Sequence, residues 1–383
     1  MLVYGRHKVS KKDINSVKKT LTSDYLATGP NIKKYENKIS KYLKCKYVSS
    51  CSSGTAALHL AFLAAGIKKN DVVILPIINF ISASNLLYNL GAKIYFCDIE
   101  KNNGLISSRT IINCIKKYKL KKIKAVVNCY LSGDSSNIRD ISKLKKKKRF
   151  ILIDDACHAL GGSYKLNNNI YKVGCAKHCD FSIFSTHALK TITTGEGGLV
   201  TTNNKDFYNK IEKIKSHGMK RSKDHYNYDI IYPGYNYRIS DINASLGISQ
   251  LSQINQFTKY RNKLANEYFK ALSEIKDISF LDKFTNYHHS YHLFRIQFKN
   301  FNSQKLNKLI NFMKKKKILL QKHYIPIYNF TFYKKIFKLD KRKFLGAEFY
   351  YSKTISLPIH MNCTSSDIKY VIEQLKKFLK LYA

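Results

Sequence analysis

The stretch FSTHALKTITTGEGG, residues 184–198, contains a single lysine, Lys190, among small, hydroxylated and glycine residues. Most of the 68 lysine and arginine residues of the chain lie instead in polar runs with helical spacing. A lysine that acts as an amine nucleophile must lose its proton, and burial beside dipolar groups lowers its pKa. An ordinary loop lysine explains this stretch equally well, so the rest of the chain must decide between the two interpretations.

Three other segments carry groups that a reactive amine could work with. CSSGTAA, residues 51–57, opens a predicted helix, and backbone N–H groups at a helix N-terminus bind phosphate. LIDDACHALG ends a predicted strand with Asp154 and Asp155, and a carboxylate there can keep a cationic ring nitrogen protonated. GYNYRISDINASLG places Asn236 just before a helix.

A phosphate cradle, an acid after a strand and a solitary lysine are together what pyridoxal phosphate requires. That cofactor needs a lysine for a Schiff base, an acidic partner for its pyridinium nitrogen and a cup for its phosphate. A nicotinamide site is disfavoured because no G-x-G-x-x-G turn follows a strand, and an NTPase site because G-x-x-x-x-G-K-[ST] is missing.

Short apolar segments alternate with helical patterns from residue 46 onward, after a first helix over residues 10–25. This alternation predicts βαβ units around a mostly parallel, buried sheet. In such sheets ligands collect at the carboxyl ends of the strands. The predicted strands cover residues 47–51, 71–76, 93–99, 123–130 and 150–157, and the predicted helices cover residues 53–66, 81–92, 107–118 and 138–148.

The alternation stops near Gly247. A long helical stretch over residues 245–275 leads into HSYHLFRIQF, a further helix, HYIPIYN and a final amphipathic helix. We therefore expect an α/β chain of two domains, a large one over residues 1–246 with an N-terminal arm and a smaller α+β one over residues 247–383.

The formal net charge of +43 and the pI near 9.8 raise the alternative of a nucleic-acid-binding protein. Against it, the lysines are scattered, and the densest runs, residues 143–149 and 313–318, have no adjacent aromatic platform. Such runs are usually solvated faces. We expect no nucleic-acid partner.

Nine cysteines without an N-terminal signal pattern predict free thiols in a reducing compartment. Cys175, His178 and Cys179 lie close together in GCAKHCD, but no second pair with zinc-like spacing accompanies them, so no metal is expected. No apolar run approaches the roughly 18 residues that a membrane crossing needs. These features predict a cytoplasmic protein without a membrane partner.

With these segments in view, the chain resembles the DegT/DnrJ/EryC1/StrS sugar aminotransferases over nearly its whole length. The resemblance rests on SDYLATGP, SSGTAALHLA, PIINFISASN, DDACHALG, FSTHALKTITTGEGG and GYNYRISDINASLGISQL. It implies fold type I of the pyridoxal phosphate enzymes, with a large α/β/α domain, a smaller C-terminal domain and a homodimer.

Within that family, SHGMKR, QKHYIPIYNFTFYKKIF and AEFYYSKTISLPIHMN are most similar to the branch that aminates C4 of a UDP-4-keto-6-deoxy-N-acetylhexosamine in the pseudaminic acid pathway. The resemblance to this branch implies L-glutamate as amino donor. Aminotransfer to another nucleotide-linked 3- or 4-keto-deoxysugar remains the main alternative.

The resemblance also implies roles for individual residues. Lys190 forms the Schiff base and moves the proton, Asp155 pairs with the pyridinium nitrogen, and His158 stands beside the phenolic oxygen. Phe80 stacks on the ring. The implied phosphate cup consists of Thr55, Ala56 and Ser185, joined by Asn236 from the partner subunit. The implied sugar-nucleotide site consists of Tyr4, Asp24, Tyr25, Leu26, Ala27, His323, Tyr324, Ile325 and Pro326.

Simpler interpretations exist for some of these residues. Phe80 taken alone is more typical of a core position, and His158 and His323 fit buried structural histidines. Some positions also depart from the family pattern: Thr186, His187 and Ala188 replace Phe-His-Pro, Asp154 replaces Glu, and Asn79 replaces Thr or Ser.

Two rival functions share the fold. A sugar dehydratase of this family is disfavoured because such relatives can carry histidine where this chain has Lys190. A non-catalytic regulatory protein would not need to retain both Lys190 and Asp155.

Overall fold

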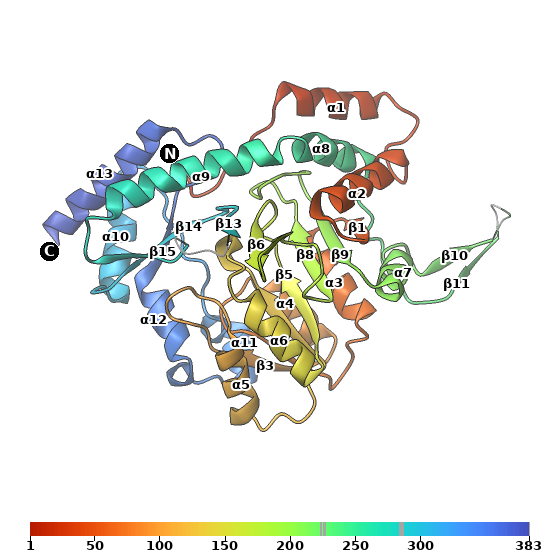
Figure 1. The fold of residues 1–383 in the computed structure, drawn as a ribbon, viewed down its shortest axis with the longest axis horizontal. Coiled ribbons are helices and arrows are strands. Elements are labelled where there is room, and N and C mark those ends of the chain that lie inside the picture. Colours follow the sequence, from red (N-terminus) through yellow and green to blue (C-terminus); the bar gives the residue numbers. More distant parts are fainter. Residues whose placement is uncertain (223, 225–226, 283–286, 383) are drawn as a thin grey trace.

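The computed structural model describes residues 1–222, 224, 227–282 and 287–382. Figure 1 shows a central sheet flanked by helices. The sheet has seven strands in the order β1-β9-β8-β5-β4-β2-β3, and only β9 runs against the other strands. The mostly parallel α/β fold predicted from the sequence is thereby confirmed. The strands are β1 (Tyr47–Cys51), β2 (Val72–Pro76), β3 (Lys93–Cys97), β4 (Ala125–Cys129), β5 (Ile151–Asp155), β8 (Phe181–Ser185) and β9 (Gly198–Thr202).

The strands are apolar because helices cover the sheet. Every residue of β4 and β9 is buried. Several helices begin at a side-chain cap that satisfies a free N–H: Ser10 caps α1, Ser53 caps α3 and Ser107 caps α5. The helices of this part are α1 (Lys11–Leu21), α2 (Pro30–Leu43), α3 (Gly54–Ala64), α4 (Ser82–Asn89), α5 (Ser108–Lys117), α6 (Ile138–Lys148), α7 (Lys205–Ile214) and α8 (Asp241–Leu251).

A second hydrophobic core forms around an antiparallel sheet of order β12-β14-β15. Its elements are α9 (Ile254–Leu272), β12 (Ile278–Phe280), β14 (Phe294–Phe298), α10 (Ser303–Lys315), β15 (Thr354–Leu357) and α13 (Ser365–Leu381). The long helical stretch expected over residues 245–275 is divided between two helices, since α8 ends at Leu251 and α9 begins at Ile254. Polar contacts hold the break, because Gln253 Nε2 donates to Asp13 Oδ1 at 3.1 Å and Ser252 Oγ to the Ser249 carbonyl at 2.7 Å.

The remaining elements connect or extend these two parts. Helices α11 (Thr331–Phe337) and α12 (Leu345–Lys353) add Tyr333 and Tyr350 to the first core although they come late in the sequence. The domain division at residue 246 stays a prediction. Three strands form a small sheet, β13 (Tyr287–His288), β6 (Ser163–Leu166) and β7 (Asn169–Lys172). The hairpin of β10 (Met219–Arg221) and β11 (Tyr228–Ile230) projects from the body of the molecule (Figure 1).

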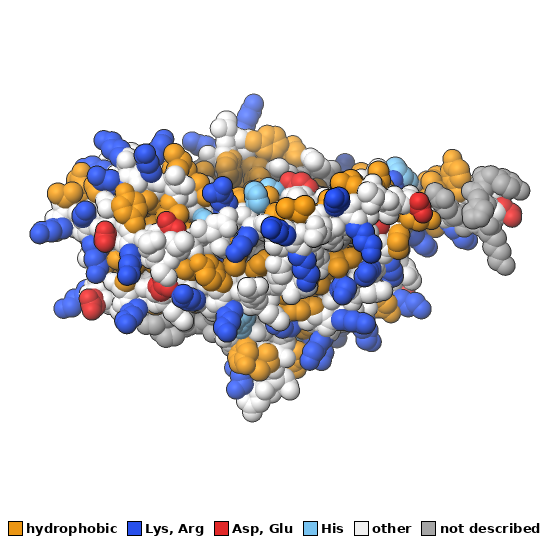
Figure 2. All heavy atoms as spheres, turned by 90° about the horizontal axis from the view of Figure 1, so that it is seen from above, with side chains coloured by type: hydrophobic (Ala, Val, Ile, Leu, Met, Phe, Trp, Pro, Cys, Tyr) orange, Lys and Arg blue, Asp and Glu red, His pale blue; other side chains and the backbone are white. Residues whose placement is uncertain are grey.

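Basic side chains are spread over the surface. Figure 2 shows lysine and arginine distributed across the visible face, interrupted by apolar and neutral residues. The nine cysteines are all free thiols. Cys175 Sγ and His178 Nδ1 both contact the hydroxyl of Tyr164, at 3.5 and 2.7 Å. None of the helices in the described ranges combines the length and the apolar composition that a membrane crossing requires.

A buried ion pair joins the second sheet to the first core. Arg295 on β14 donates from Nε to Asp282 Oδ1 at 3.2 Å and from Nη1 to the Asn103 carbonyl at 2.7 Å. Both charged residues are 1% exposed. Replacing Asp282 with alanine removes the ion-pair partner of a buried guanidinium, so we expect the free energy of unfolding to fall by about 3–5 kcal/mol in urea titrations.

Asp340 supplies the matched control, because it pairs with Arg342 at the surface, where water solvates both groups. Asp340→Ala should leave the urea midpoint unchanged. Equal urea midpoints for the Asp282 and Asp340 variants would show that the Asp282–Arg295 ion pair does not stabilise the fold.

Candidate active site

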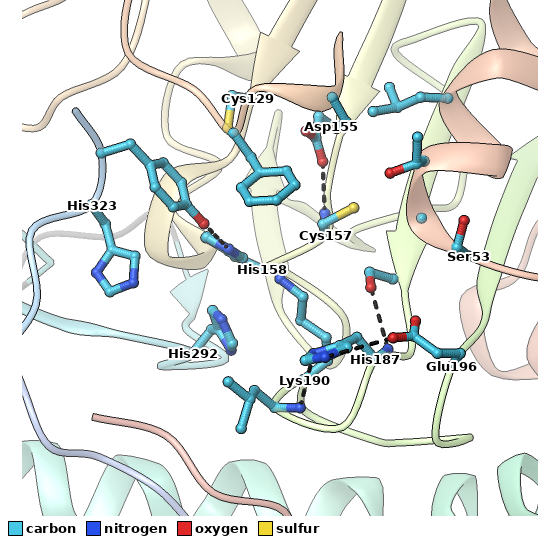
Figure 3. A pocket seen from close by; sticks show the side chains of 18 of the residues that line it. Ser53, Cys129, Asp155, Cys157, His158, His187, Lys190, Glu196, His292 and His323 are labelled. Atoms are coloured by element: carbon cyan, nitrogen blue, oxygen red, sulfur yellow. Dashed lines mark hydrogen bonds and ion pairs between the residues drawn. The ribbon is translucent and has the colours of Figure 1, made fainter. Parts of the chain in front are cut away.

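A cavity of about 490 Å³ opens at the carboxyl ends of the parallel strands (Figure 3). Cys129, Asp155 and Ser185 are the last residues of β4, β5 and β8, and each lines it. Because the ends of parallel strands meet at one sheet edge, residues far apart in the sequence converge here. The predicted site residues that line the cavity are Tyr4, Thr55, Phe80, Asp155, His158, Ser185, Lys190, His323 and Tyr324.

Lys190 enters the cavity from the turn after β8. Its main-chain N–H donates to the His187 carbonyl at 2.9 Å, which holds the turn. Within the described residues, no group accepts a hydrogen bond or forms an ion pair with its Nζ. Burial lowers the pKa of the ammonium, and the nearby Cys157 and Asp155 only partly oppose this. The amine is therefore more easily deprotonated than a surface lysine, as a nucleophile or general base must be.

The two adjacent acids at the end of β5 face different surroundings, because successive strand residues point to opposite sides. Asp155 lines the cavity, and its Oδ1 accepts the Cys157 N–H at 3.1 Å. Asp154 lies outside the cavity and accepts from Asn128 Nδ2 at 3.0 Å and Tyr130 Oη at 2.7 Å. Burial raises the pKa of Asp154 to about 6. Asp155 is thus the carboxylate that is available to a ligand. Asp154, which stands where the family pattern has Glu, does not line the cavity.

The start of α3 forms a cradle next to Ser185. Gly54 is required there, since a Cβ at this position would stand 2.9 Å from the Cβ of Ser185. Among the described residues, nothing accepts the N–H groups of Gly54 and Thr55, whereas the Ala56 N–H donates to Ser53 Oγ at 3.0 Å. The free amides and the Ser53 and Ser185 hydroxyls suit an anion such as a phosphate.

Phe80 is not a core residue. Its side chain is 54% exposed, lines the cavity, and meets the Tyr324 ring edge-on with centroids 5.8 Å apart. The neighbouring Asn79 is buried and donates to the Pro76 carbonyl. Thr186 is also buried, and its hydroxyl pairs with that of Thr194 at 2.7 Å, so this family departure is accommodated by a local hydrogen bond.

Three imidazoles form one wall of the cavity. The rings of His158 and His292 lie 4.2 Å apart, centroid to centroid, and His323 Nδ1 is 2.9 Å from Ser356 Oγ. Burial, followed by the nearby Lys190 charge, lowers the pKa of His158 well below its usual value and that of His323 to about 3. All three are neutral at physiological pH because burial lowers the pKa of His292 as well. The wall therefore offers oriented N–H and N groups without adding charge beside the amine.

Some predicted residues lie outside this cavity within a single chain. Ala56 and Ile325 each follow a lining residue without lining the cavity themselves, and Pro326 does not line it either. Asn236 is exposed and bridges to Ser216. The stretch Asp24, Tyr25, Leu26 and Ala27 is also exposed. Their assignment to the cofactor and sugar-nucleotide sites stays a prediction.

Other lining residues were not predicted. Cys129 ends a strand and could have been found by the strand-end rule that identified Asp155. His292 comes from the segment before β14, and nothing in its local pattern indicates that it meets His158. Its Nδ1 is buried without a partner in the described part of the chain. Cys157 also lines the cavity, and no role was predicted for it.

Comparisons with known proteins agree with this geometry. A family model described as the DegT/DnrJ/EryC1/StrS aminotransferase family matches residues 7–376. A UDP-4-amino-4,6-dideoxy-N-acetyl-beta-L-altrosamine transaminase of Campylobacter jejuni is 35% identical over 382 residues, which cover 99% of this chain and 98% of that protein.

Solved structures show the same fold. Helicobacter pylori PseC, an aminotransferase involved in the biosynthesis of pseudoaminic acid, has a TM-score of 0.90 at 28% identity, with 99% of both chains covered. The PLP form of Spr1654, a putative sugar aminotransferase from Streptococcus pneumoniae, has a TM-score of 0.91 at 25% identity, again with 99% of both chains covered.

Proposed function

Since the chain belongs to the DegT/DnrJ/EryC1/StrS aminotransferase family, we propose that it uses pyridoxal phosphate to transfer the amino group of L-glutamate to C4 of a UDP-4-keto-6-deoxy-N-acetylhexosamine. The product would be UDP-4-amino-4,6-dideoxy-N-acetyl-β-L-altrosamine, an intermediate of pseudaminic acid biosynthesis. The observation that carries the chemistry is Lys190, unpaired within the described residues and of lowered pKa, in one cavity with the Asp155 carboxylate. The similarity to the Campylobacter jejuni transaminase supports the substrate.

The residues present fit pyridoxal phosphate. The cradle at Gly54 and Ser185 has free amides for a phosphate, and the Asp155 carboxylate, which lines the cavity, suits a pyridinium N–H. The exposed face of Phe80 suits stacking against a planar ring. Thr55 and Ser185 would hold the phosphate, Asp155 the ring nitrogen and Lys190 the aldehyde carbon.

Each protein group then has a separate task. When bound, the cofactor supplies an electron sink for the negative charge that develops at the donor's α-carbon. Lys190 Nζ removes the α-proton of glutamate and later returns a proton to C4 of the sugar. Asp155 keeps the ring nitrogen protonated, and the neutral imidazoles add no competing positive charge near Lys190. Glutamate leaves as 2-oxoglutarate, and the ketone of the sugar becomes an amine.

We infer that the active unit is a homodimer in which Asn236 reaches the partner's cofactor phosphate. Asn236 is exposed and lies outside the cavity of its own chain, which agrees with a role across an interface. The nucleotide part of the substrate would extend from the cavity past Tyr4 and His323, which line it. The exposed stretch that contains Tyr25 is the other part of this site that the resemblance implies.

The substrate is tested by incubating the protein with pyridoxal phosphate, L-glutamate and a set of nucleotide-linked keto-sugars that differ in the keto position, the ring configuration and the nucleotide. We expect amine product by mass spectrometry with the UDP-4-keto-6-deoxy-L-sugar. Product from a 3-keto or TDP-linked sugar alone would keep the aminotransferase and replace the substrate, whereas loss of water from a sugar without amine gain would indicate the dehydratase.

A further inference from the structure

Both ring nitrogens of His158 form hydrogen bonds within the chain. The Ser132 N–H donates to Nδ1 at 3.2 Å, so Nδ1 carries no proton. A neutral imidazole has a single N–H, which must therefore lie on Nε2. Nε2 is 3.0 Å from the hydroxyl of Tyr324, as the dashed line in Figure 3 marks, so this N–H donates to the Tyr324 oxygen.

The turn that presents Ser132 to His158 is built for this contact. Ser132 has a φ of +69°, and its hydroxyl donates to Asp282 Oδ2 at 3.1 Å and the Leu293 carbonyl at 2.9 Å. Gly133 follows with a φ of +107°, and a Cβ there would stand 2.8 Å from the His158 carbonyl. The turn requires the positive φ angles of Ser132 and Gly133. It sets the tautomer of His158 because it presents the Ser132 N–H to Nδ1.

Tyr324 consequently keeps its own hydroxyl proton for another acceptor. Its oxygen accepts the hydrogen bond from the His158 Nε2–H, and no acceptor for its own O–H exists within the described residues. The ring lines the cavity beside Phe80. Burial, together with Cys129 and Asp155, raises the pKa of Tyr324 well above its usual value, so the hydroxyl stays protonated. Tyr324 thus presents a neutral, oriented O–H donor in the cavity that Asp155 also lines.

We propose that Tyr324 donates this hydrogen bond to the phenolic oxygen of the bound cofactor, and that His158 is a positioning residue that turns the Tyr324 hydroxyl toward it. This inference rests on the proposed use of pyridoxal phosphate. It assigns the contact to a residue that the resemblance placed in the sugar-nucleotide site, because His158 has no second proton to give.

The direct test is the pH midpoint of the absorbance change of the bound cofactor. A hydrogen bond to an anionic oxygen favours the deprotonated form, so Tyr324→Phe should raise the midpoint by about one pH unit. His158→Leu should raise it too, and the double variant should shift no further than Tyr324→Phe alone. His158→Gln, which retains an N–H for Tyr324, should restore the midpoint.

Tyr328→Phe is the matched control, since Tyr328 lies four residues after Tyr324, is not part of the cavity lining, and its hydroxyl donates to Glu348. Its midpoint should equal that of the unmodified protein. The other ionisable groups near Tyr324 and His158 are kept in every variant, so they cannot produce the shift: Tyr4, Cys129, Asp155, Cys157, Lys190, His292, Arg295 and His323.

A second measurement needs no cofactor. Nitrogen-15 shifts of His158 in the full-length apoprotein should show Nδ1 unprotonated and Nε2 protonated. The opposite tautomer, or an unshifted midpoint in Tyr324→Phe, would overturn the proposal. If the unmodified protein binds no pyridoxal phosphate, the proposed function fails instead. Cofactor binding by the unmodified protein therefore distinguishes the two failures.

Discussion

Replacing Lys190 with alanine is expected to lower the rate of amino transfer by about 10⁴-fold or more, the upper range for a positioned general base. The loss follows because Lys190 Nζ is the one amine in the cavity lining and has no structural partner within the described residues. For the same reason folding should be unaffected. The measurements are steady-state turnover with glutamate and the keto-sugar, covalent cofactor attachment after borohydride reduction, and urea unfolding.

Lys322→Ala is the control for this variant. Burial also lowers the pKa of Lys322, but its Nζ donates to Asn307 Oδ1 at 3.2 Å, away from the cavity. Turnover should therefore stay within a few-fold of the unmodified protein. Near-normal turnover in Lys190→Ala would remove the basis of the catalytic assignment.

Replacing Asp155 with asparagine should lower turnover by about 10²- to 10³-fold, the range seen when one preorganised electrostatic partner is removed. Asparagine keeps the size of the side chain and can still accept the Cys157 N–H. It cannot hold a proton on the ring nitrogen by charge. We therefore expect cofactor binding to weaken and kcat to fall, while the urea midpoint changes little.

The adjacent acid gives the contrast. Asp154 accepts hydrogen bonds from Asn128 and Tyr130 behind the strand, so Asp154→Asn should lower stability and leave kcat close to that of the unmodified protein. Equal losses of kcat in the two variants would contradict the assignment of a catalytic role to Asp155 and a structural role to Asp154.

Much of this site could be predicted because its chemistry follows strand ends. Each of the residues Asp155 and Ser185 ends an apolar strand, and Lys190 follows in a glycine-rich turn. A parallel sheet brings such ends to one edge, whatever the sequence distance between them. Local pattern and topology were sufficient to expect Asp155 at this edge. No strand was predicted over residues 181–185, so the expected role of Ser185 came from the family resemblance.

The rest depends on contacts that no local pattern contains. His292 meets His158 only because the segment before β14 folds back over the strand ends. The direction of the His158–Tyr324 hydrogen bond depends on Ser132, which lies 26 residues before His158 in a turn with positive φ. The break between α8 and α9 lacks glycine and proline, and depends on the polar contact between Gln253 and Asp13.

The most direct test of the central claim is a half-reaction followed by absorbance. The protein is loaded with pyridoxal phosphate, treated with L-glutamate, freed of donor, and then given the UDP-4-keto-6-deoxy-N-acetylhexosamine. We predict that glutamate converts the cofactor to its pyridoxamine form with stoichiometric release of 2-oxoglutarate, and that the keto-sugar restores the original spectrum. A spectrum that glutamate and other amino donors leave unchanged would contradict the account.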